Sequence, residues 1–326
     1  MKIFVTRKIP EPGLAVLKKE FTLEVNPEDR VLSKEEIIKG IKGKDGLLCL
    51  LTDPIDKEVI DAEPGLKMIA SYAVGYDNID IAAATKRRIP VSNTPGVLTE
   101  TTAELAWALL FTVARRIVEG DTFTREGKFT GWAPMLLLGQ DVSHKTLGVI
   151  GTGRIGTAFA LKSQGFHMNV LYADEQRNEP LEQQLGATKV PLQKLLKESD
   201  FISIHVPLTK DTFHLIDEKE LRMMKKTAIL INTARGPIIN EKALVKALSE
   251  QWIFGAGLDV YEKEPALSPE FKQLKNVILQ PHTGSGTIET RTKMALMAAE
   301  NLRIGLQGGI PPNCINKEVF QNKPTG

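Results

Sequence analysis

The stretch that decides the fold is TLGVIGTGRIG, residues 146–156, followed by a helical pattern and then by MNVLY at 168–172. Five residues with strand character lead into a turn that contains Gly151, Gly153 and Gly156. The first glycine permits a tight turn, the second lets a diphosphate approach the backbone, and the third lets the helix pack closely on the strand. This strand–turn–helix context favours a dinucleotide-binding βαβ unit over an ordinary turn.

The second strand of this unit ends at Asp174, about 20 residues after Gly151, where an acid accepts hydrogen bonds from the adenosine ribose. The unsatisfied amides at the start of the intervening helix would face the diphosphate. A carboxylate beside the ribose repels a 2′-phosphate, so NAD(H) is favoured as the cofactor. Arg177 lies close enough in sequence to keep NADP(H) as an alternative.

Length and composition indicate a globular protein with two domains. A chain of 326 residues is long for a single core. The net charge of +2 gives no single-sign field, so neither nucleic acid nor a membrane is expected as a partner.

The two cysteines, Cys49 and Cys314, form neither a metal-ligand spacing nor a disulfide framework, so no metal is expected. No signal-peptide pattern opens the chain and the most apolar stretch, 103–114, is too short to cross a bilayer, which favours a cytoplasmic location.

Strands and helices alternate along the chain, which predicts parallel sheets of the α/β class. Residues 1 to about 98 are expected to form a first small α/β domain, with Ser33 as the N-cap of a helix. Residues 99–286 are expected to form a doubly wound nucleotide domain. The strands are predicted at 2–6, 21–25, 47–51 and 68–72 in the first domain and at 146–150, 168–172, 200–204, 227–231, 254–258 and 277–279 in the second.

A long helical pattern at 101–117 precedes a segment without clear periodicity, 120–145, which carries the apolar run WAPMLLL at 132–138. Such a loop either packs on its own domain or is covered by a partner subunit. We favour the second alternative, a homodimer formed through helix 101–117 and loop 120–145.

Three candidate catalytic residues follow predicted strands of the second domain: Arg235, Glu264 and His282. Ligands of open parallel sheets bind outside the carboxyl ends of the strands, so these side chains are expected to converge. Taken singly, Arg235 could be a surface ion-pair residue, Glu264 a solvated loop acid and His282 a buried histidine. Together they would supply a carboxylate clamp, a partner that orients the imidazole and a proton donor, and we favour this catalytic interpretation.

The ordered motifs along the chain resemble those of the D-isomer-specific 2-hydroxyacid dehydrogenase family over essentially its full length. They are AVGYDNID at 73–80, NTPG at 93–96, TAEL at 102–105, the glycine turn, HVPL at 205–208, NTARGP at 232–237, DVYE at 259–262 and PHTGS at 281–285. The resemblance implies a Rossmann nucleotide domain, 99–286, and a smaller flavodoxin-like substrate domain, 1–98, completed by residues 287–326.

The resemblance also implies roles for individual residues. His282 would protonate the keto oxygen of the substrate, and Glu264 would hold its imidazole. Arg235 would bind the substrate carboxylate with the backbone amides of Val74 and Gly75, and Leu51 would lie in the same substrate site. The residues implied in cofactor binding are Thr102, Gly151, Gly153, Arg154, Ile155, Gly156, Asp174, Val206, Pro207, Thr212, Thr233, Ala234, Arg235, Asp259, His282 and Gly284.

Within the family, Pro237, the 132–138 loop and LLTD at 50–53 are most similar to glyoxylate/hydroxypyruvate reductases. This similarity implies reduction of a small 2-oxo acid to glycolate or a D-2-hydroxy acid. Two alternatives stay open: a D-3-phosphoglycerate or D-lactate type of dehydrogenase, and an NADH-sensing binding protein like the C-terminal-binding corepressors. Val74 stands where phosphite-oxidising relatives carry a lysine, which argues against that chemistry.

Overall fold

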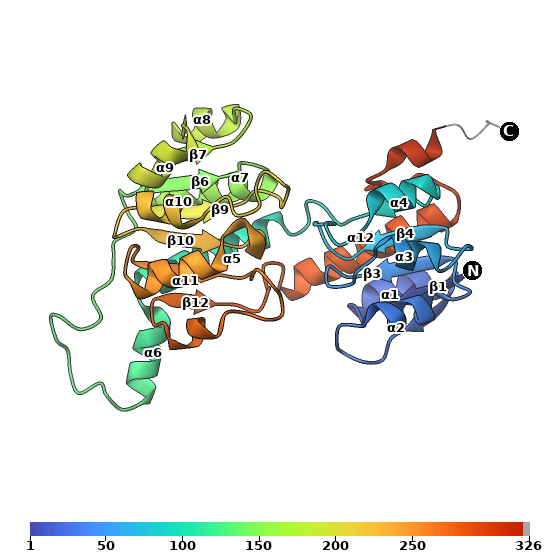
Figure 1. Cartoon of the computed structure of the whole chain (residues 1–326), viewed down its shortest axis with the longest axis horizontal. Coiled ribbons are helices and arrows are strands. Elements are labelled where there is room, and N and C mark those ends of the chain that lie inside the picture. Colours follow the sequence, from blue (N-terminus) through green and yellow to red (C-terminus); the bar gives the residue numbers. More distant parts are fainter. Residues whose placement is uncertain (322–326) are drawn as a thin grey trace. The chain divides into compact units, whose positions relative to one another are not determined.

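A computed structural model describes residues 1–321. The chain forms two compact units, Met1–Leu98 together with the chain from Gly286 onward, and Thr99–Ser285. We call them unit 1 and unit 2. Each is built around its own parallel β-sheet covered by helices (Figure 1), so the predicted α/β class is confirmed.

Unit 1 contains a five-stranded sheet with the order β2-β1-β3-β4-β5. Its elements are β1 (Lys2–Val5), α1 (Glu11–Lys18), β2 (Thr22–Val25), α2 (Lys34–Ile41), β3 (Gly46–Cys49), α3 (Lys57–Asp61), β4 (Met68–Ser71), α4 (Ile81–Lys86), β5 (Val91–Ser92), α12 (Ile288–Leu306) and the 3₁₀ helix η4 (Lys317–Phe320). The strands β3 and β4 are buried along their whole length, as expected for a parallel sheet covered on both faces.

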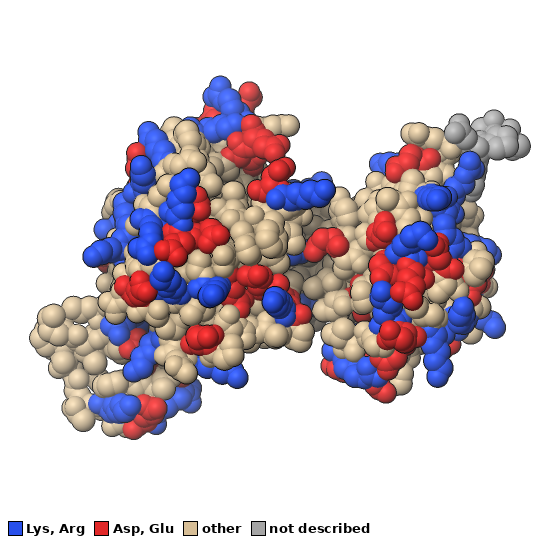
Figure 2. Space-filling model, viewed as in Figure 1, with Lys and Arg blue, Asp and Glu red and all other residues tan. Residues whose placement is uncertain are grey.

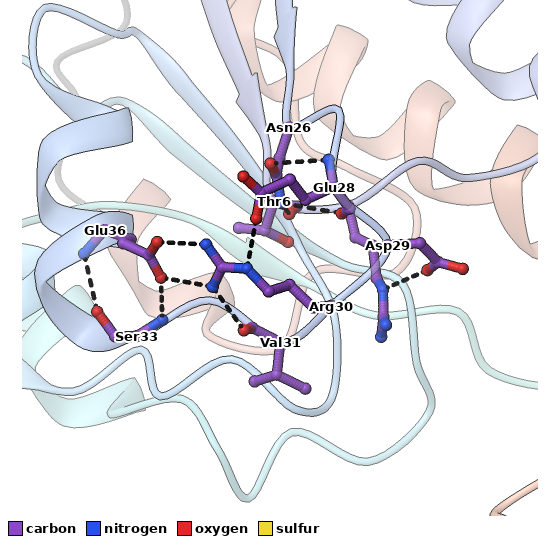
Figure 3. A network of polar contacts seen from close by, with 9 residues as sticks. Thr6, Asn26, Glu28, Asp29, Arg30, Val31, Ser33 and Glu36 are labelled. Carbon is purple, nitrogen blue, oxygen red and sulfur yellow. Dashed lines mark hydrogen bonds and ion pairs between the residues drawn. The ribbon is translucent and has the colours of Figure 1, made fainter.

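The long helix α12 joins this unit by packing against α1. A Cβ atom at Gly13 would lie 2.6 Å from the backbone oxygen of Ala295, so only a glycine lets the two helices approach this closely. Ser33 caps α2 as predicted: its hydroxyl accepts the Glu36 N–H, and the Glu36 carboxylate accepts the Ser33 N–H (Figure 3).

Unit 2 contains a seven-stranded sheet with the order β12-β11-β10-β9-β6-β7-β8, paired in parallel throughout. Its helices are α5 (Thr99–Ala114), α6 (Ile117–Arg125), α7 (Arg154–Leu161), η1 (Lys162–Phe166), α8 (Glu179–Leu185), α9 (Leu192–Glu198), α10 (Glu218–Met223), η2 (Gly236–Ile238), α11 (Glu241–Ser249) and η3 (Pro269–Gln273). Its strands are β6 (Thr146–Ile150), β7 (Asn169–Ala173), β8 (Thr188–Lys189), β9 (Phe201–Ile204), β10 (Ile229–Asn232), β11 (Gly255–Leu258) and β12 (Val277–Leu279).

Helix α5 lies on this sheet because its apolar side is buried and because β11 carries small residues. A Cβ atom at Gly257 would lie 2.9 Å from Cβ of Leu109. The indole N–H of Trp107 donates to the Phe159 carbonyl at 2.9 Å and ties α5 to α7. Within residues 1–321 we find no helix with the length and apolar character needed to cross a bilayer.

The helix predicted at 101–117 is divided in the structure. It ends at Ala114, whose carbonyl accepts the N–H of Gln140 at 2.8 Å, and Arg116 adopts a left-handed φ of 52°. The returning chain therefore crosses the end of α5, and a new helix, α6, begins at Ile117. Helix α6 and the loop 126–140, which we call the arm, project from unit 2 (Figure 1).

The arm exposes apolar side chains that a folded chain ordinarily buries. Trp132 is 85% exposed and Met135 76%, and Phe129 and Leu138 are more than half exposed. No residue of α6 is buried. In Figure 2 the loop of the arm consists largely of residues that are neither acidic nor basic on the visible face.

Candidate active site

The glycine turn has the backbone geometry that the sequence requires. Gly151 adopts φ 87°, which favours glycine, and a Cβ atom there would lie 2.6 Å from Cγ1 of Val206. A Cβ atom at Gly156 would lie 2.0 Å from the Gly151 carbonyl oxygen, so α7 can start against β6 only with glycine at this position. No atom of the described chain lies within 4 Å of a Cβ atom at Gly153, so the turn borders open space.

Gly153 is also the N-cap of α7, with Arg154 and Ile155 as the next two residues. A glycine has no side chain to accept hydrogen bonds from the first amides of the helix. Those amides and the positive end of the helix dipole therefore suit an anion such as a diphosphate.

Asp174 follows β7 and turns its carboxylate toward the glycine turn. Its Oδ2 accepts hydrogen bonds from the backbone N–H of Thr152 at 2.6 Å and from the Thr152 hydroxyl at 3.0 Å. Partial burial alone would raise the pKa of Asp174, but these hydrogen bonds outweigh it and lower the pKa. The group is therefore a fixed anion beside the turn at neutral pH.

Arg177, the residue that kept NADP(H) as an alternative, is paired with Glu182. Glu182 also accepts a hydrogen bond from the hydroxyl of Tyr172 at 2.5 Å. The pairing raises the pKa of Arg177, and the guanidinium is held beside α8 by this carboxylate.

His282 and Glu264, which are 18 residues apart in the chain, form a direct pair. The imidazole Nδ1 lies 2.7 Å from Oε2 of Glu264, and both side chains are 26% exposed. His282 follows β12 and adopts a left-handed φ of 55°, a conformation that costs a non-glycine residue about 1–3 kcal/mol. Strained backbone of this kind concentrates at sites where a side chain must point in one direction.

Arg235 contributes to the electrostatics of the same pair. Partial burial would raise the pKa of Glu264, but the hydrogen bond and charge of His282, the N–H of Tyr261 and the charge of Arg235 together lower it. The Arg235 guanidinium donates to the Ala234 carbonyl at 2.8 Å. The structure thus brings the three predicted catalytic residues together at the carboxyl edge of the unit 2 sheet.

Two supporting residues were not predicted from the sequence. Tyr261 donates its N–H to Oε1 of Glu264 at 3.0 Å and its hydroxyl to the Gln280 carbonyl at 2.8 Å, so it links the loops of Glu264 and His282. Glu241 binds the same loop, because its carboxylate accepts the N–H of Glu262 at 3.0 Å. The contacts of Tyr261 with Gln280 and of Glu241 with Glu262 join positions about 20 residues apart, and no local pattern in the sequence marks them.

Asp259, Thr102 and Gly284 form a second group at this edge. Asp259 is fully buried, and its carboxylate accepts the backbone N–H groups of Thr283 and Gly284, each at 2.7 Å. Burial raises the pKa of Asp259 and outweighs these hydrogen bonds. A Cβ atom at Gly284 would lie 3.2 Å from Oδ2 of Asp259 and 3.3 Å from Cγ2 of Thr102, so these three predicted cofactor residues are neighbours.

The remaining predicted cofactor residues lie on two turns of unit 2. After β9, the Thr212 hydroxyl donates to the Pro207 carbonyl at 2.6 Å and closes the turn that starts at Val206. After β10, the Ala234 N–H donates to the side chain of Asn232 at 3.0 Å. Beside it, the buried hydroxyl of Thr233 has no hydrogen-bond partner among the described residues, so a ligand group could satisfy it.

The predicted substrate residues Leu51, Val74 and Gly75 lie in unit 1. The Leu51 loop is fixed by Asp53, a buried carboxylate that accepts the N–H of Leu50 at 2.7 Å. Burial raises the pKa of Asp53. The Val74 carbonyl accepts a hydrogen bond from the side chain of Asn93 at 2.8 Å, which holds the turn after β4.

His205, the first residue of the HVPL motif, packs beneath the glycine turn. Its ring lies 5.0 Å from that of Phe159, and its Nε2 is 2.9 Å from the Ser203 hydroxyl. Burial lowers the pKa of His205 to about 3, so it is a neutral packing residue.

The model of the NAD binding domain of D-isomer specific 2-hydroxyacid dehydrogenases matches residues 107–284, which is more than half of the chain. Unit 2, with its glycine turn and its doubly wound sheet, is the part of the chain that this match covers. The chain belongs to the D-isomer specific 2-hydroxyacid dehydrogenase family, and the predicted family is confirmed.

Individual relatives match over the full length. The chain is 54% identical to the glyoxylate reductase of Korarchaeum cryptofilum, across 100% of this chain and 98% of that protein. The crystal structure of a Thermus thermophilus protein superposes with a TM-score of 0.91 at 44% identity, covering 97% of this chain and 100% of that one. The crystal structure of a glyoxylate reductase from Paecilomyes thermophila has a TM-score of 0.86 at 32% identity, covering 98% and 99%.

Proposed function

We propose that this protein is an NADH-dependent reductase of small 2-oxo acids, with glyoxylate or hydroxypyruvate as the substrate. The observation that carries the proposal is the 2.7 Å contact between His282 and Glu264, in the same unit as the dinucleotide turn. A full-length relative named glyoxylate reductase, 54% identical to this chain, supports the choice of substrate.

His282 is the proton donor. Because Glu264 is ionised and can only accept, Nδ1 of His282 donates to it, which leaves Nε2 to carry the proton that passes to the keto oxygen. Arg235 binds the substrate carboxylate through its planar guanidinium. The bound nicotinamide supplies the hydride.

The residues of unit 2 fit a dinucleotide. The open space beside Gly153 and the unpartnered buried hydroxyl of Thr233 are features that a bound cofactor would use. Asp174 is the acceptor for the adenosine ribose, and its fixed negative charge disfavours a 2′-phosphate. Glu182 pairs with Arg177 and so competes with a 2′-phosphate for its guanidinium.

The cofactor preference is testable at Asp174. Asp174→Ala removes the ribose acceptor and the repulsive charge, so the ratio of kcat/KM with NADH to that with NADPH should fall by about 10- to 100-fold. Glu175→Ala, the neighbouring acid, is the control and should leave the ratio unchanged. An Asp174→Ala ratio equal to that of the wild type would contradict the assignment of NADH.

The proposal extends to the substrate residues predicted in unit 1. The backbone amides of Val74 and Gly75 donate to the substrate carboxylate, and Leu51 contacts the rest of the molecule. The buried Asp53 that fixes the Leu51 loop supports this role, because a rigid loop loses little entropy on binding.

The protein acts as a homodimer in which the arm of one subunit is covered by a second copy of the chain. Four large apolar side chains more than half exposed within one short segment support this assembly. The double variant Trp132→Ser/Met135→Ser should dissociate to monomers in sedimentation equilibrium. Ile310→Ser, at an apolar residue of unit 1 that is 59% exposed, should leave the mass unchanged. A monomeric wild-type protein at micromolar concentration would contradict the proposal.

The activity is tested by following NADH absorbance with the full-length protein and a panel of glyoxylate, hydroxypyruvate, pyruvate and 3-phosphohydroxypyruvate. We expect the highest kcat/KM with glyoxylate or hydroxypyruvate. Preference for one of the other two acids would support the lactate-type or phosphoglycerate-type alternative. NADH binding without turnover of any of these acids would support the corepressor-like alternative.

A further inference from the structure

Unit 1 has a topological switch point of its own. In the order β2-β1-β3-β4-β5, the chain leaves β1 toward β2 on one side, while β3 lies on the other side of β1. In open parallel sheets ligands bind in the crevice that such a reversal leaves outside the carboxyl ends of the strands, here those of β1 and β3.

A crevice of about 600 Å³ lies at this place. The loop after β1 contributes Arg7 and Lys8, the end of β3 is followed by Leu50, and Tyr72 follows β4. The first turn of α12 closes the crevice with Arg291. All these residues belong to unit 1, so the crevice lies within one compact unit.

The lining of the crevice is basic. Arg7, Lys8 and Arg291 are cationic, and Asp29 is the one acid among the lining residues. Asp29 pairs with Arg7 at 2.7 Å, but its side chain is 94% exposed, so most of its charge is screened by water. Lys8 is exposed and makes no ion pair within the described part of the chain. The positive end of the 19-residue helix α12 adds to this field.

The walls of the crevice are held in place by hydrogen bonds. The loop that carries Asp29 is fastened at both ends: the Asn26 side chain donates to the Thr6 carbonyl at 3.0 Å, and Arg30 binds the Glu36 carboxylate (Figure 3). On the opposite wall, the hydroxyl of Tyr72 donates to the Arg291 carbonyl at 2.7 Å and fixes the first turn of α12 to β4. A preformed basic crevice binds an anion without having to order its own walls.

We propose that this crevice binds a small carboxylate or phosphate anion through Lys8, Arg7 and Arg291. Two kinds of ligand have such an anionic group. One is a longer 2-oxo acid with an acid group at its far end, and the other is a free anion that binds independently of the substrate. The proposal rests on the switch point and on the charge of the lining, and it holds whether or not the protein is a glyoxylate reductase.

The direct test is titration calorimetry of the full-length protein with inorganic phosphate. Lys8→Gln should raise the Kd by about 3- to 10-fold, and Lys8→Glu by more, because an attractive charge is replaced by a repulsive one. Lys86→Gln is the matched control, since Lys86 is also an exposed lysine of unit 1 and lies outside the crevice. Thermal melts of the three variants check that each is folded.

Steady-state kinetics distinguish the two kinds of ligand. If the anion is part of the substrate, phosphate competes with oxaloacetate, and Lys8→Gln raises the KM for oxaloacetate by a larger factor than the KM for glyoxylate. If the anion is free, phosphate still binds and the ratio of the two KM values is unchanged. Absence of saturable phosphate binding to the wild type, or the same Kd in Lys8→Gln, Lys8→Glu and Lys86→Gln, would overturn the proposal. Calorimetry needs no turnover, so this failure is separate from a failure of the reductase assignment.

Discussion

Replacing Glu264 with glutamine should lower turnover without disturbing the loop. The glutamine oxygen can still accept the N–H of Tyr261, which the carboxylate accepts at 3.0 Å. What the variant loses is the negative charge 2.7 Å from Nδ1 of His282. The effect therefore reports on the charge of the carboxylate more than on its packing.

The size of the effect follows from the geometry. A hydrogen bond to an ionised group contributes about 1.5–3 kcal/mol. Because both side chains are 26% exposed, water screens part of this contribution, and we take about 1.4–2.7 kcal/mol, which corresponds to about 10- to 100-fold in kcat. The same contact lowers the pKa of Glu264, so the carboxylate is ionised throughout the neutral range and loses its effect only as the pH falls through that lowered pKa.

Without the charge, the hydrogen bond that holds the His282 imidazole should be weaker, and kcat for reduction at about pH 7.5 should fall about 10- to 100-fold. The deficit should stay constant across the neutral range and shrink only as the pH falls through the lowered pKa of Glu264, where the wild type loses the charge as well. The pH profile of kcat is measured with saturating glyoxylate and NADH in buffers of constant ionic strength.

Glu262→Gln is the matched control, because Glu262 is an acid of the same loop whose carboxylate accepts the Glu241 N–H. It should leave kcat unchanged. Equal kcat values for Glu264→Gln and the wild type at about pH 7.5 would refute the reasoning, and so would an equal fall in Glu262→Gln.

Two further substitutions test other parts of the site. Arg235→Lys replaces a planar, bidentate guanidinium by a point charge and should raise the KM for glyoxylate about tenfold or more in steady-state assays; an unchanged KM would contradict the carboxylate clamp. Gly156→Ala places a Cβ atom 2.0 Å from the Gly151 carbonyl oxygen. It should lower the free energy of unfolding by about 1–3 kcal/mol in urea unfolding. Gly165→Ala is the control and should be tolerated, because no described atom lies within 4 Å of the Cβ atom that it adds. Equal stabilities of the two alanine variants would show that the close packing of α7 on β6 is not required.

The sequence was most informative where local chemistry determines the structure. Gly151 and Gly156 lie where φ or close packing requires glycine, Gly153 borders open space, and the strand at 146–150 has the predicted bounds. The other strands of the nucleotide unit lie within two residues of their predicted ends. The short strands β5 and β8 were missed because two residues carry no periodicity.

Other features depend on contacts between distant parts of the chain, and no single-sequence pattern could provide them. The end of α5 at Ala114 is set by Gln140, which returns after the arm to bond its carbonyl. The contacts of Glu241 with the Glu262 N–H and of the Tyr261 hydroxyl with the Gln280 carbonyl likewise exist only once the sheet has formed. The convergence of Arg235, Glu264 and His282 was predictable in outline, because strand ends of one parallel sheet meet at one edge.

The most direct test of the central claim, that His282 supplies the proton for reduction of the keto group, is a comparison of wild type and His282→Ala in two measurements on the same preparation. We predict that kcat with glyoxylate falls by about 10²–10⁴-fold while the Kd for NADH, followed by its fluorescence, stays within about threefold of the wild type. Turnover by His282→Ala at the wild-type rate would contradict the claim.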